Sequence, residues 1–441
     1  MASTGLSRTC TQGNNKTATL SVWLKRAGGF GVEQYILGFG LVAGAYTQIA
    51  FNSGDNIAVS NFNGGGVSDI RALAKYRDLA AWYHFCVAFD SSQNTESNRI
   101  KYYINGTQIT GSDLDVNYPA LNADCVFNNN GQPCTVGMSN TPGGYYNGSM
   151  AMMDWVDGLQ LDPTYFGSFD SASGIWTPTA TSTISDYGVN GFKLAMDTTT
   201  PGADTSGKSN TFTASGTPTL LQGNPQNNWC TLNPLNSTGN GTEPTYANGN
   251  TQSSSPSSGG GYVGSSTIGV SSGKWFWEFK KSGGSATNIY NGVGNILSTG
   301  EIARNSAVGV YYGNQVFYRP DGTKQVVTNG SNANSSYGAS WTTSNVIGIA
   351  LDLNSATNTV TFYKDGASQG AINLPTNTDT WFFNVVCGTD TVDTWQLNFG
   401  EGFFGTTAAG TNADGNGQGL FAYAVPSGYY ALNTKNLEAY G

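Results

Sequence analysis

Paired carboxylates are the first residues to consider, because two acids held about 5 to 9.5 Å apart across a groove can hydrolyse glycosidic bonds. No two of the seven glutamates fall within ten residues of each other: Glu33, Glu96, Glu243, Glu278, Glu301, Glu401 and Glu438. We interpret Asp113 and Asp115 as a turn cluster, and Asp154 and Asp157 as residues that flank a hairpin. The carboxylates therefore predict no catalytic pair, and a glycan depolymerase is kept only as an alternative function.

The single histidine, His84, is the residue that a Ser-His-Asp triad would have to use. It lies in the run AWYHFCVAFD, where Phe85, Val87 and Phe89 alternate with His84, Cys86 and Ala88. This period of two is typical of a strand. We interpret His84 as a structural residue on a sheet face, so the sequence predicts no catalytic residue and no enzyme.

Aromatic residues beside planar polar side chains suit sugar binding, because ring faces stack on sugar C–H groups while amides make directional hydrogen bonds. Tyr311, Tyr312, Tyr318 and Trp341 lie in turn-rich surroundings with Asn314, Gln315 and Arg319. Strand alternation cannot place both Tyr311 and Tyr312 on one face, so at least one of them is expected to face solvent. We predict these four aromatic residues as the ligand-binding site.

The metal and disulfide questions stay open from sequence. Calcium prefers oxygen ligands on loops, and Asp55, Asp113, Asp115 and Asp124 could supply them, but no EF-hand spacing is present. No other cofactor is expected, and the metal ligands are left unassigned. Six cysteines occur without a CxxC pair, and Cys125 and Cys134 flank the turn-rich stretch FNNNGQP, where a disulfide could close in an oxidising medium.

The composition limits the class of protein. At 441 residues the chain can form two or three domains, and its charged residues amount to only 11% against about 25% in average proteins. A net charge of −9 without a Lys/Arg cluster argues against nucleic acid as a partner. No stretch approaches about 18 apolar residues, so membrane insertion is not expected. The start, MASTGLSRTCTQ, lacks the features of a secretory signal, which predicts synthesis in a cytoplasm.

Short alternating strands recur along both halves of the chain, beginning with TATLSVWLKR, where Leu20, Val22 and Leu24 alternate with polar or aromatic neighbours. A weak repeat relates HFCVAFDSSQNTESNRIKYYINGTQI to VIGIALDLNSATNTVTFYKDGASQGAI. Its Asn105-Gly106 and Asp365-Gly366 dipeptides are typical of type I′ hairpins. The sequence therefore predicts an all-β protein of two antiparallel, jelly-roll-type sandwiches, over 1–200 and 263–441, joined by a Gly/Ser/Thr/Asn-rich linker with long loops over 201–262.

Both halves also resemble known domains. LSRTCTQGNNKTATLSVWLKR, WYHFCVAFDSSQNTESNRIKYYINGTQI and YYNGSMAMMDWVDGLQLDPTYFG resemble the laminin-G-like, concanavalin-type domain that recurs in marine bacteriophage proteins, over about residues 1 to 200. NNWCTLNPL, STIGVSSGKWFWEF, SYGASWTTSNVIGIALDLNSATNTVTFYKDGASQG, LNFG and VPSGYYALNTKNL are similar to the SPRY-type domain that follows it in those proteins, over about 225 to 441.

The resemblance implies a structural protein on the virion surface, in a tail or head fibre, that binds a host-surface glycan or receptor non-covalently. Its expected partners are other virion proteins and the host polysaccharide, and we expect a homo-oligomer, by default a trimer, although no coiled-coil heptads support it. Two alternatives remain: a capsid-decorating protein with an architectural role, and the glycan depolymerase. A cellular peptide-binding module is disfavoured, because no accompanying signalling domain occurs.

Overall fold

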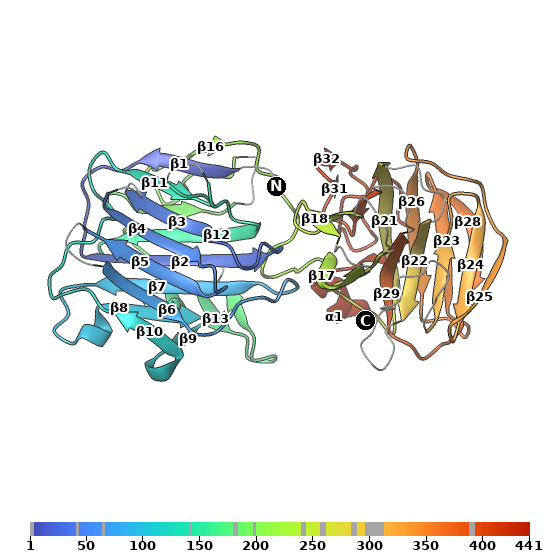
Figure 1. Ribbon diagram of the computed structural model, residues 1–441, viewed down its shortest axis with the longest axis horizontal. Helices are drawn as coiled ribbons and strands as arrows, with labels where there is room; N and C mark the ends of the chain where they lie inside the picture. Colours follow the sequence, from blue (N-terminus) through green and yellow to red (C-terminus); the bar gives the residue numbers. More distant parts are fainter. Residues whose placement is uncertain are drawn as a thin grey trace. The chain divides into compact units, whose positions relative to one another are not determined.

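Two compact units make up the chain, over Met1–Leu220 and Leu221–Gly441. The computed structural model describes residues 4–40, 44–63, 67–140, 143–179, 184–196, 200–239, 244–255, 262–283, 289–295, 313–387 and 393–441. Antiparallel sheets dominate both units, and the described residues hold one short α-helix, α1 (Thr434–Tyr440). The predicted all-β class of antiparallel β-sandwiches is confirmed (Figure 1).

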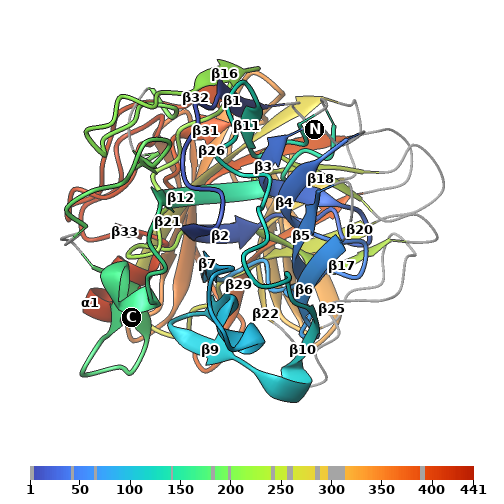
Figure 2. The same cartoon turned by 90° about the vertical axis from the view of Figure 1, so that its left-hand side faces the viewer.

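The first unit packs two sheets face to face. One has the strand order β10 (Leu114–Asn117), β6 (Val67–Ala72), β5 (Ile57–Phe62), β4 (Tyr46–Phe51), β3 (Gln34–Gly40), β11 (Pro133–Val136), β1 (Gly5–Thr9), β16 (Thr213–Ser215). The other has the order β15 (Phe192–Leu194), β12 (Gly148–Asp157), β2 (Thr17–Arg26), β7 (Tyr83–Asp90), β8 (Ile100–Ile104), β9 (Thr107–Ile109). In Figure 2 the first unit faces the viewer, with β3, β4 and β5 on one side and β12, β2 and β7 on the other.

Strand alternation places the core of the first unit as the sequence predicts. Leu20, Val22 and Leu24 of β2 are fully buried between the sheets, as are Phe85 and Val87 of β7. The opposite face of β2, with its polar and aromatic residues, is buried too. The hairpin of β13 (Gly167–Phe169) and β14 (Trp176–Pro178), with the residues around it, packs against that outer face.

The second unit repeats the arrangement with different strand lengths. One sheet has the order β17 (Leu232–Gly239), β20 (Tyr262–Ser266), β29 (Trp381–Cys387), β22 (Ile289–Asn295), β23 (Gln315–Tyr318), β24 (Thr323–Thr328), β25 (Ser331–Ser336). The other has the order β18 (Thr245–Ala247), β19 (Gln252–Ser254), β30 (Thr394–Asn398), β21 (Lys274–Gly283), β26 (Val346–Asp352), β27 (Thr359–Lys364), β28 (Ala367–Asn373), with β33 (Tyr430–Ala431) pairing beside β21. A small hairpin of β31 (Phe403–Phe404) and β32 (Thr407–Ala408) lies in the C-terminal segment.

Both predicted hairpin turns are present. Asn105 and Gly106 have φ of 46° and 75°, and Asp365 and Gly366 have φ of 50° and 82°, so both central residues of each turn are left-handed as a type I′ turn requires. These turns join β8 to β9 and β27 to β28. The strand-loop-hairpin unit seen in the sequence repeat therefore occurs once in each sandwich.

The prediction of a linker over 201–262 is wrong. Within that range, β16 pairs with β1 of the first unit, while β17, β18, β19 and β20 are strands of the second. Along the chain, the first unit ends at residue 220 and the second begins at residue 221, close to the start of the SPRY-type resemblance near 225. Strand pairing uses backbone hydrogen bonds, so a Ser/Thr/Asn-rich segment can form short edge strands without the apolar alternation by which strands are recognised in sequence.

Candidate functional site

Two of the four predicted ligand-binding residues lie in the hydrophobic core. Tyr318 and Trp341 are 0% and 2% exposed and belong to the core of the second sandwich. The Tyr318 hydroxyl donates a hydrogen bond to the Ala339 carbonyl, and the Trp341 ring packs edge-on against Phe279 at 5.7 Å between centroids. The prediction is wrong for both residues. The register of β23 turns Tyr318 inward, and Trp341 packs in the same core. Tyr311 and Tyr312 lie outside the described residues.

His84 is held in a sealed aromatic environment between the outer face of β7 and the hairpin β13–β14. The Trp176 indole N–H donates to His84 Nδ1 at 3.0 Å, and His84 Nε2 lies 2.9 Å from Ser21 Oγ. Since Nδ1 accepts, the neutral ring carries its proton on Nε2 and donates it to the serine. Burial lowers the pKa of His84 to about 3. This arrangement is the reverse of a triad, in which the imidazole accepts the proton of the serine.

Asp154 and Asp157 of β12 point to opposite faces of their sheet. Asp154 pairs with Ser21 on the outer face, where it accepts a hydrogen bond of 2.6 Å from the Tyr187 hydroxyl, and burial raises its pKa to about 6. Asp157 lies toward the inner side and accepts from the backbone N–H groups of Asn14 and Asn190. Two carboxylates on opposite faces cannot flank one sugar, so this pair does not form a glycosidase site.

Three of the four aspartates considered for calcium are engaged with cations of the protein. Asp115 pairs with Arg71, and Asp124 pairs with Lys16 at 3.2 Å. Both carboxylate oxygens of Asp55 accept hydrogen bonds from arginines. Within the described part of the chain, His, Cys, Asp and Glu side chains form no group of three that could hold a metal ion.

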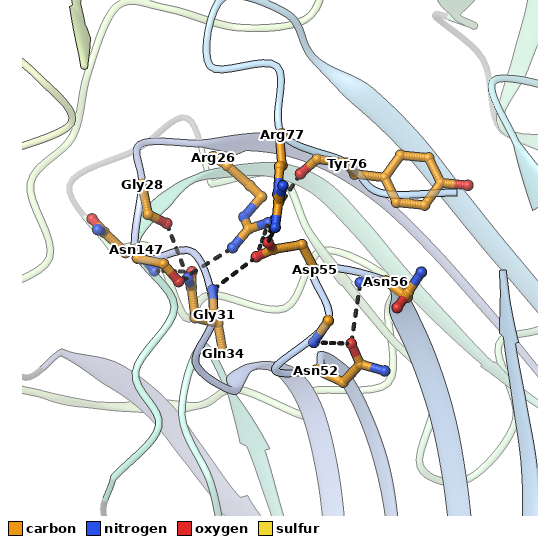
Figure 3. A network of polar contacts seen from close by, with 12 residues as sticks. Arg26, Gly28, Gly31, Gln34, Asn52, Asp55, Asn56, Tyr76, Arg77 and Asn147 are labelled. Carbon is orange, nitrogen blue, oxygen red and sulfur yellow. Dashed lines mark hydrogen bonds and ion pairs between the residues drawn. The ribbon is translucent and has the colours of Figure 1, made fainter. Parts of the chain in front are cut away.

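Asp55 is the centre of a buried polar network that ties together four loops at one end of the first sandwich (Figure 3). Its Oδ1 accepts from Arg26 Nη1 at 3.1 Å and from the Gly31 N–H at 3.2 Å, and its Oδ2 accepts from Arg77 Nε at 2.6 Å. The side chains of Arg26 and Asp55 are 0% exposed, whereas that of Arg77 is 48% exposed. Burial opposes the ionisation of Asp55, but the hydrogen bonds from Arg77, Gly31 and Arg26 outweigh it and hold its pKa below the ordinary value.

Arg26 extends the Figure 3 network to the backbone. Its Nη1 also donates to the Tyr76 carbonyl at 2.9 Å, and its guanidinium lies 4.7 and 4.3 Å from the ring centroids of Phe30 and Phe51. Gln34 donates to the Gly28 carbonyl and accepts from the Asn147 N–H. The network therefore fixes the loops around Gly28–Gly31, Asn52–Asn56, Tyr76–Arg77 and Asn147 relative to one another.

A cluster of partly exposed tyrosines, which we name the tyrosine patch, lies on the outer face of β21, β26 and β27. It consists of Tyr363 on β27 and of Tyr423 and Tyr429 in the C-terminal segment. Tyr363 and Tyr429 pack against a buried aromatic base, in which Phe276 lies 6.4 Å from Tyr363 and 5.2 Å from Phe421. The C-terminal segment is anchored there because Glu278 accepts the backbone N–H groups of Ala422 and Tyr423.

Polar groups border the tyrosine patch. Lys274 Nζ lies 5.7 Å from the Tyr429 ring centroid and 2.8 Å from Asp352 Oδ2. At the other side, the ring of Tyr423 lies against Gly366, whose missing Cβ would fall 2.9 Å from Tyr423 Cδ1. The patch thus combines aromatic rings, hydroxyls and fixed charges at the surface, which is the combination that sugar binding requires.

Sequence analysis missed the tyrosine patch. Tyr423 and Tyr429 lie outside the regular strands or at their margin, so no strand period identified the face to which they belong. The signal that could have found them is the number of tyrosines near the C-terminus in FAYAVPSGYY, where Gly and Pro interrupt any strand.

Comparison with known proteins supports the concanavalin-like fold. Residues 3–159 match the Concanavalin A-like lectin/glucanases superfamily, and no curated protein matches the chain. Among solved structures, the SPRY domain of human HERC1 is 17% identical with a TM-score of 0.30, over 38% of this chain and 96% of that one. Domains LG4-5 of the mouse laminin alpha1 chain are 9% identical with a TM-score of 0.31, over 98% of this chain and 84% of that one. In the described residues, no helix has the length and apolar character needed to cross a membrane. The superfamily match shows that the first half of the chain carries a concanavalin-like domain.

Proposed function

We propose that the protein is a bacteriophage virion component, displayed on a tail or head fibre, that binds a host-surface glycan without cleaving it. The match of residues 3–159 to the Concanavalin A-like lectin/glucanases superfamily and the marine bacteriophage resemblance of both halves support this proposal. The protein would be made in the host cytoplasm and displayed as a homo-oligomer, with a trimer as the default.

The tyrosine patch is the observation that carries the proposal. Its three rings are only partly buried, and Tyr363 and Tyr429 pack against a buried base of Phe276 and Phe421, so the patch offers aromatic surface on a rigid support. Stacking of sugar faces on such rings needs no charge on the ligand. Lys274 at the border, whose side chain is 35% exposed, would add hydrogen bonds to sugar hydroxyls and so contribute to specificity, while the buried Asp352 holds it in place.

The test is binding of the purified full chain to host cells and to their extracted surface polysaccharide, with and without calcium. Release of reducing sugar is measured in the same tubes. Saturable binding without new reducing ends supports the proposal. Sugar release would favour the depolymerase instead, and no binding under any condition would favour capsid decoration.

Variants locate the binding to the patch. Tyr429→Ala and Tyr363→Ala remove rings at the surface, and we expect each to weaken binding at least about fivefold, since stacking contributes on the order of 1 kcal/mol or more per ring. Tyr165→Ala is the matched control, because Tyr165 is a 36% exposed tyrosine of the first unit. Equal loss of binding in Tyr165→Ala and Tyr429→Ala would contradict the assignment to the patch.

A further inference from the structure

Cys10 and Cys134 lie on the same face of adjacent strands. In the pairing of β1 with β11, Arg8 is opposite Cys134, and the Cys10 N–H donates to the Gln132 carbonyl at 2.8 Å. Because alternate residues of a strand face the same side, Cys10 and Cys134 are diagonal neighbours on the inner face. The two thiol groups are hydrogen-bonded to each other.

This contact differs from the disulfide considered in the sequence analysis. Cys125 is only nine positions from Cys134, but the thiol that meets Cys134 is that of Cys10. Cys10 and Cys134 are 1% and 0% exposed and belong to the core of the first sandwich. Cys86 lies on the outer face of the other sheet, and Cys230 belongs to the second unit.

The surroundings favour the thiolate form of Cys10. The hydrogen bond from Cys134 lowers the pKa of the Cys10 thiol, and the positive charge of Arg8 lowers it further, although burial opposes both. A thiolate is the form that attacks a disulfide. The pair therefore offers a nucleophilic sulfur with a second thiol already in contact with it.

We propose that Cys10 and Cys134 form a disulfide when the protein leaves a reducing cytoplasm. In the reaction, the Cys10 thiolate attacks a small-molecule disulfide and releases one of its thiols, and Cys134 then displaces the second thiol from the mixed disulfide. Both cysteines lose their protons, the pair is oxidised by two electrons, and the small disulfide is reduced to two thiols. The moment of oxidation depends on the proposed display outside the cell, whereas the pairing itself depends only on the strand register.

The cross-link would tie β1 to β11 and close the chain from residue 10 to residue 134. β1 lies near one edge of its sheet, with only β16 beyond it. A disulfide across so long a loop restricts the unfolded chain strongly. We therefore expect oxidation to raise the melting temperature of the first unit by on the order of 5–10 °C.

The test uses the full chain, purified reduced and then incubated with oxidised glutathione. Thiols are counted after unfolding in denaturant, and we expect the count to fall by two from the six cysteines of the sequence. Peptides are then analysed without reduction after combined digestion with trypsin and chymotrypsin. Trypsin alone leaves Cys125 and Cys134 in one peptide, since no Lys or Arg lies from 102 to 192, whereas chymotryptic cleavage after Phe127 separates them.

A peptide containing Cys10 linked to one containing Cys134 is the expected result. Cys125→Ser should leave that link and the rise in melting temperature unchanged, while Cys10→Ser should abolish both. A thiol count that stays at six, a link through Cys125 or a link between two chains would each overturn the proposal. Because the peptides come from the unaltered chain, the result stands even if Cys10→Ser fails to fold. Glycan binding is not measured, so a failure here leaves the proposed function untouched.

Discussion

Replacing Asp55 with Asn tests whether the network of Figure 3 holds the loop end of the first sandwich together. Asn is the appropriate replacement because Asp55 has a φ of 65°, a left-handed conformation that Asn tolerates better than other side chains. The change keeps the size of the side chain and removes its charge. The buried guanidinium of Arg26 then loses its counter-ion.

The expected cost follows from burial. Both side chains of the Arg26–Asp55 pair are 0% exposed, and leaving one charge of a buried pair uncompensated costs about 3–5 kcal/mol. Arg77 adds little, since its side chain is 48% exposed and water screens the interaction. We therefore expect Asp55→Asn to lower the free energy of unfolding of the first unit by about 3–5 kcal/mol. In a unit of this size that corresponds to a fall in melting temperature of about 8–15 °C.

Hydrogen exchange followed by mass spectrometry is the suitable assay, because it reports on each unit separately. Peptides from β2 and β4 should lose protection in Asp55→Asn, while peptides from β21 and β26 serve as an internal reference. The matched control is Asp115→Asn, which removes an exposed partner of Arg71 and should cost no more than about 1 kcal/mol.

A double-mutant cycle separates the ion pair from other effects of the substitution. Arg26→Met places an apolar chain between Phe30 and Phe51, whose ring centroids lie 4.7 and 4.3 Å from the guanidinium carbon. Combined with Asp55→Asn it removes both charges, so the double variant should lose at least about 2 kcal/mol less than the sum of the single losses. Additive losses, or a loss in Asp55→Asn no larger than in Asp115→Asn, would refute the reasoning.

Three further outcomes follow from single contacts. Burial lowers the pKa of His84 to about 3, so the stability that neutral His84 contributes is present above pH 6.5, its ordinary pKa, and is lost as the pH falls. Burial raises the pKa of Glu278 to about 7, so the stability that protonated Glu278 contributes is present below pH 4.5, its ordinary pKa, and is lost as the pH rises. The free energy of unfolding is therefore measured with denaturant between pH 4 and 8. Compared with the unaltered chain, it should fall less toward acid pH in His84→Gln and less toward neutral pH in Glu278→Gln. Gly106→Ala should cost about 2–4 kcal/mol, since its Cβ would fall 2.3 Å from Trp176 Cε3, whereas Gly111→Ala, with a left-handed φ but open space, should cost about 1–2 kcal/mol. Glycan affinity at the tyrosine patch should change less than about threefold between 0.05 and 0.5 M salt, as measured by calorimetry, because stacking and hydrogen bonding are not screened.

The elements that alternate strictly could be predicted from the sequence, and the contacts between distant segments could not. Leu20, Val22 and Leu24 face the core as their period indicates, and the Asn105-Gly106 turn has the left-handed geometry that its residue types favour. Tyr318 has the same alternation, but nothing local shows which of the two faces of β23 is the inner one. A reversed choice of face turns a core residue into an apparent binding residue.

Two sets of buried polar contacts depend on segments that show no strand period in the sequence. Trp176, which donates to His84, is 92 positions away in a three-residue strand. The Asp55 network joins loops whose residues have no periodic pattern, and only the folded chain brings Arg26 and Arg77 to the same carboxylate. Long-range loop contacts of this kind depend on the sheet register, which single-sequence patterns do not contain.

The use of charge links the stability of the fold to its proposed role. Only 11% of the residues are charged, and several of these are buried and bound to backbone or to each other: Arg26, Asp55, Asp157, Glu278, Lys281, Asp393 and Asp414. Asp55 fixes loops of the first unit, and Glu278 holds the C-terminal segment that carries Tyr423 and Tyr429. Fixed loops reduce the entropy lost when a ligand binds. The buried charges therefore help to position the tyrosine patch, the surface that we propose binds a glycan.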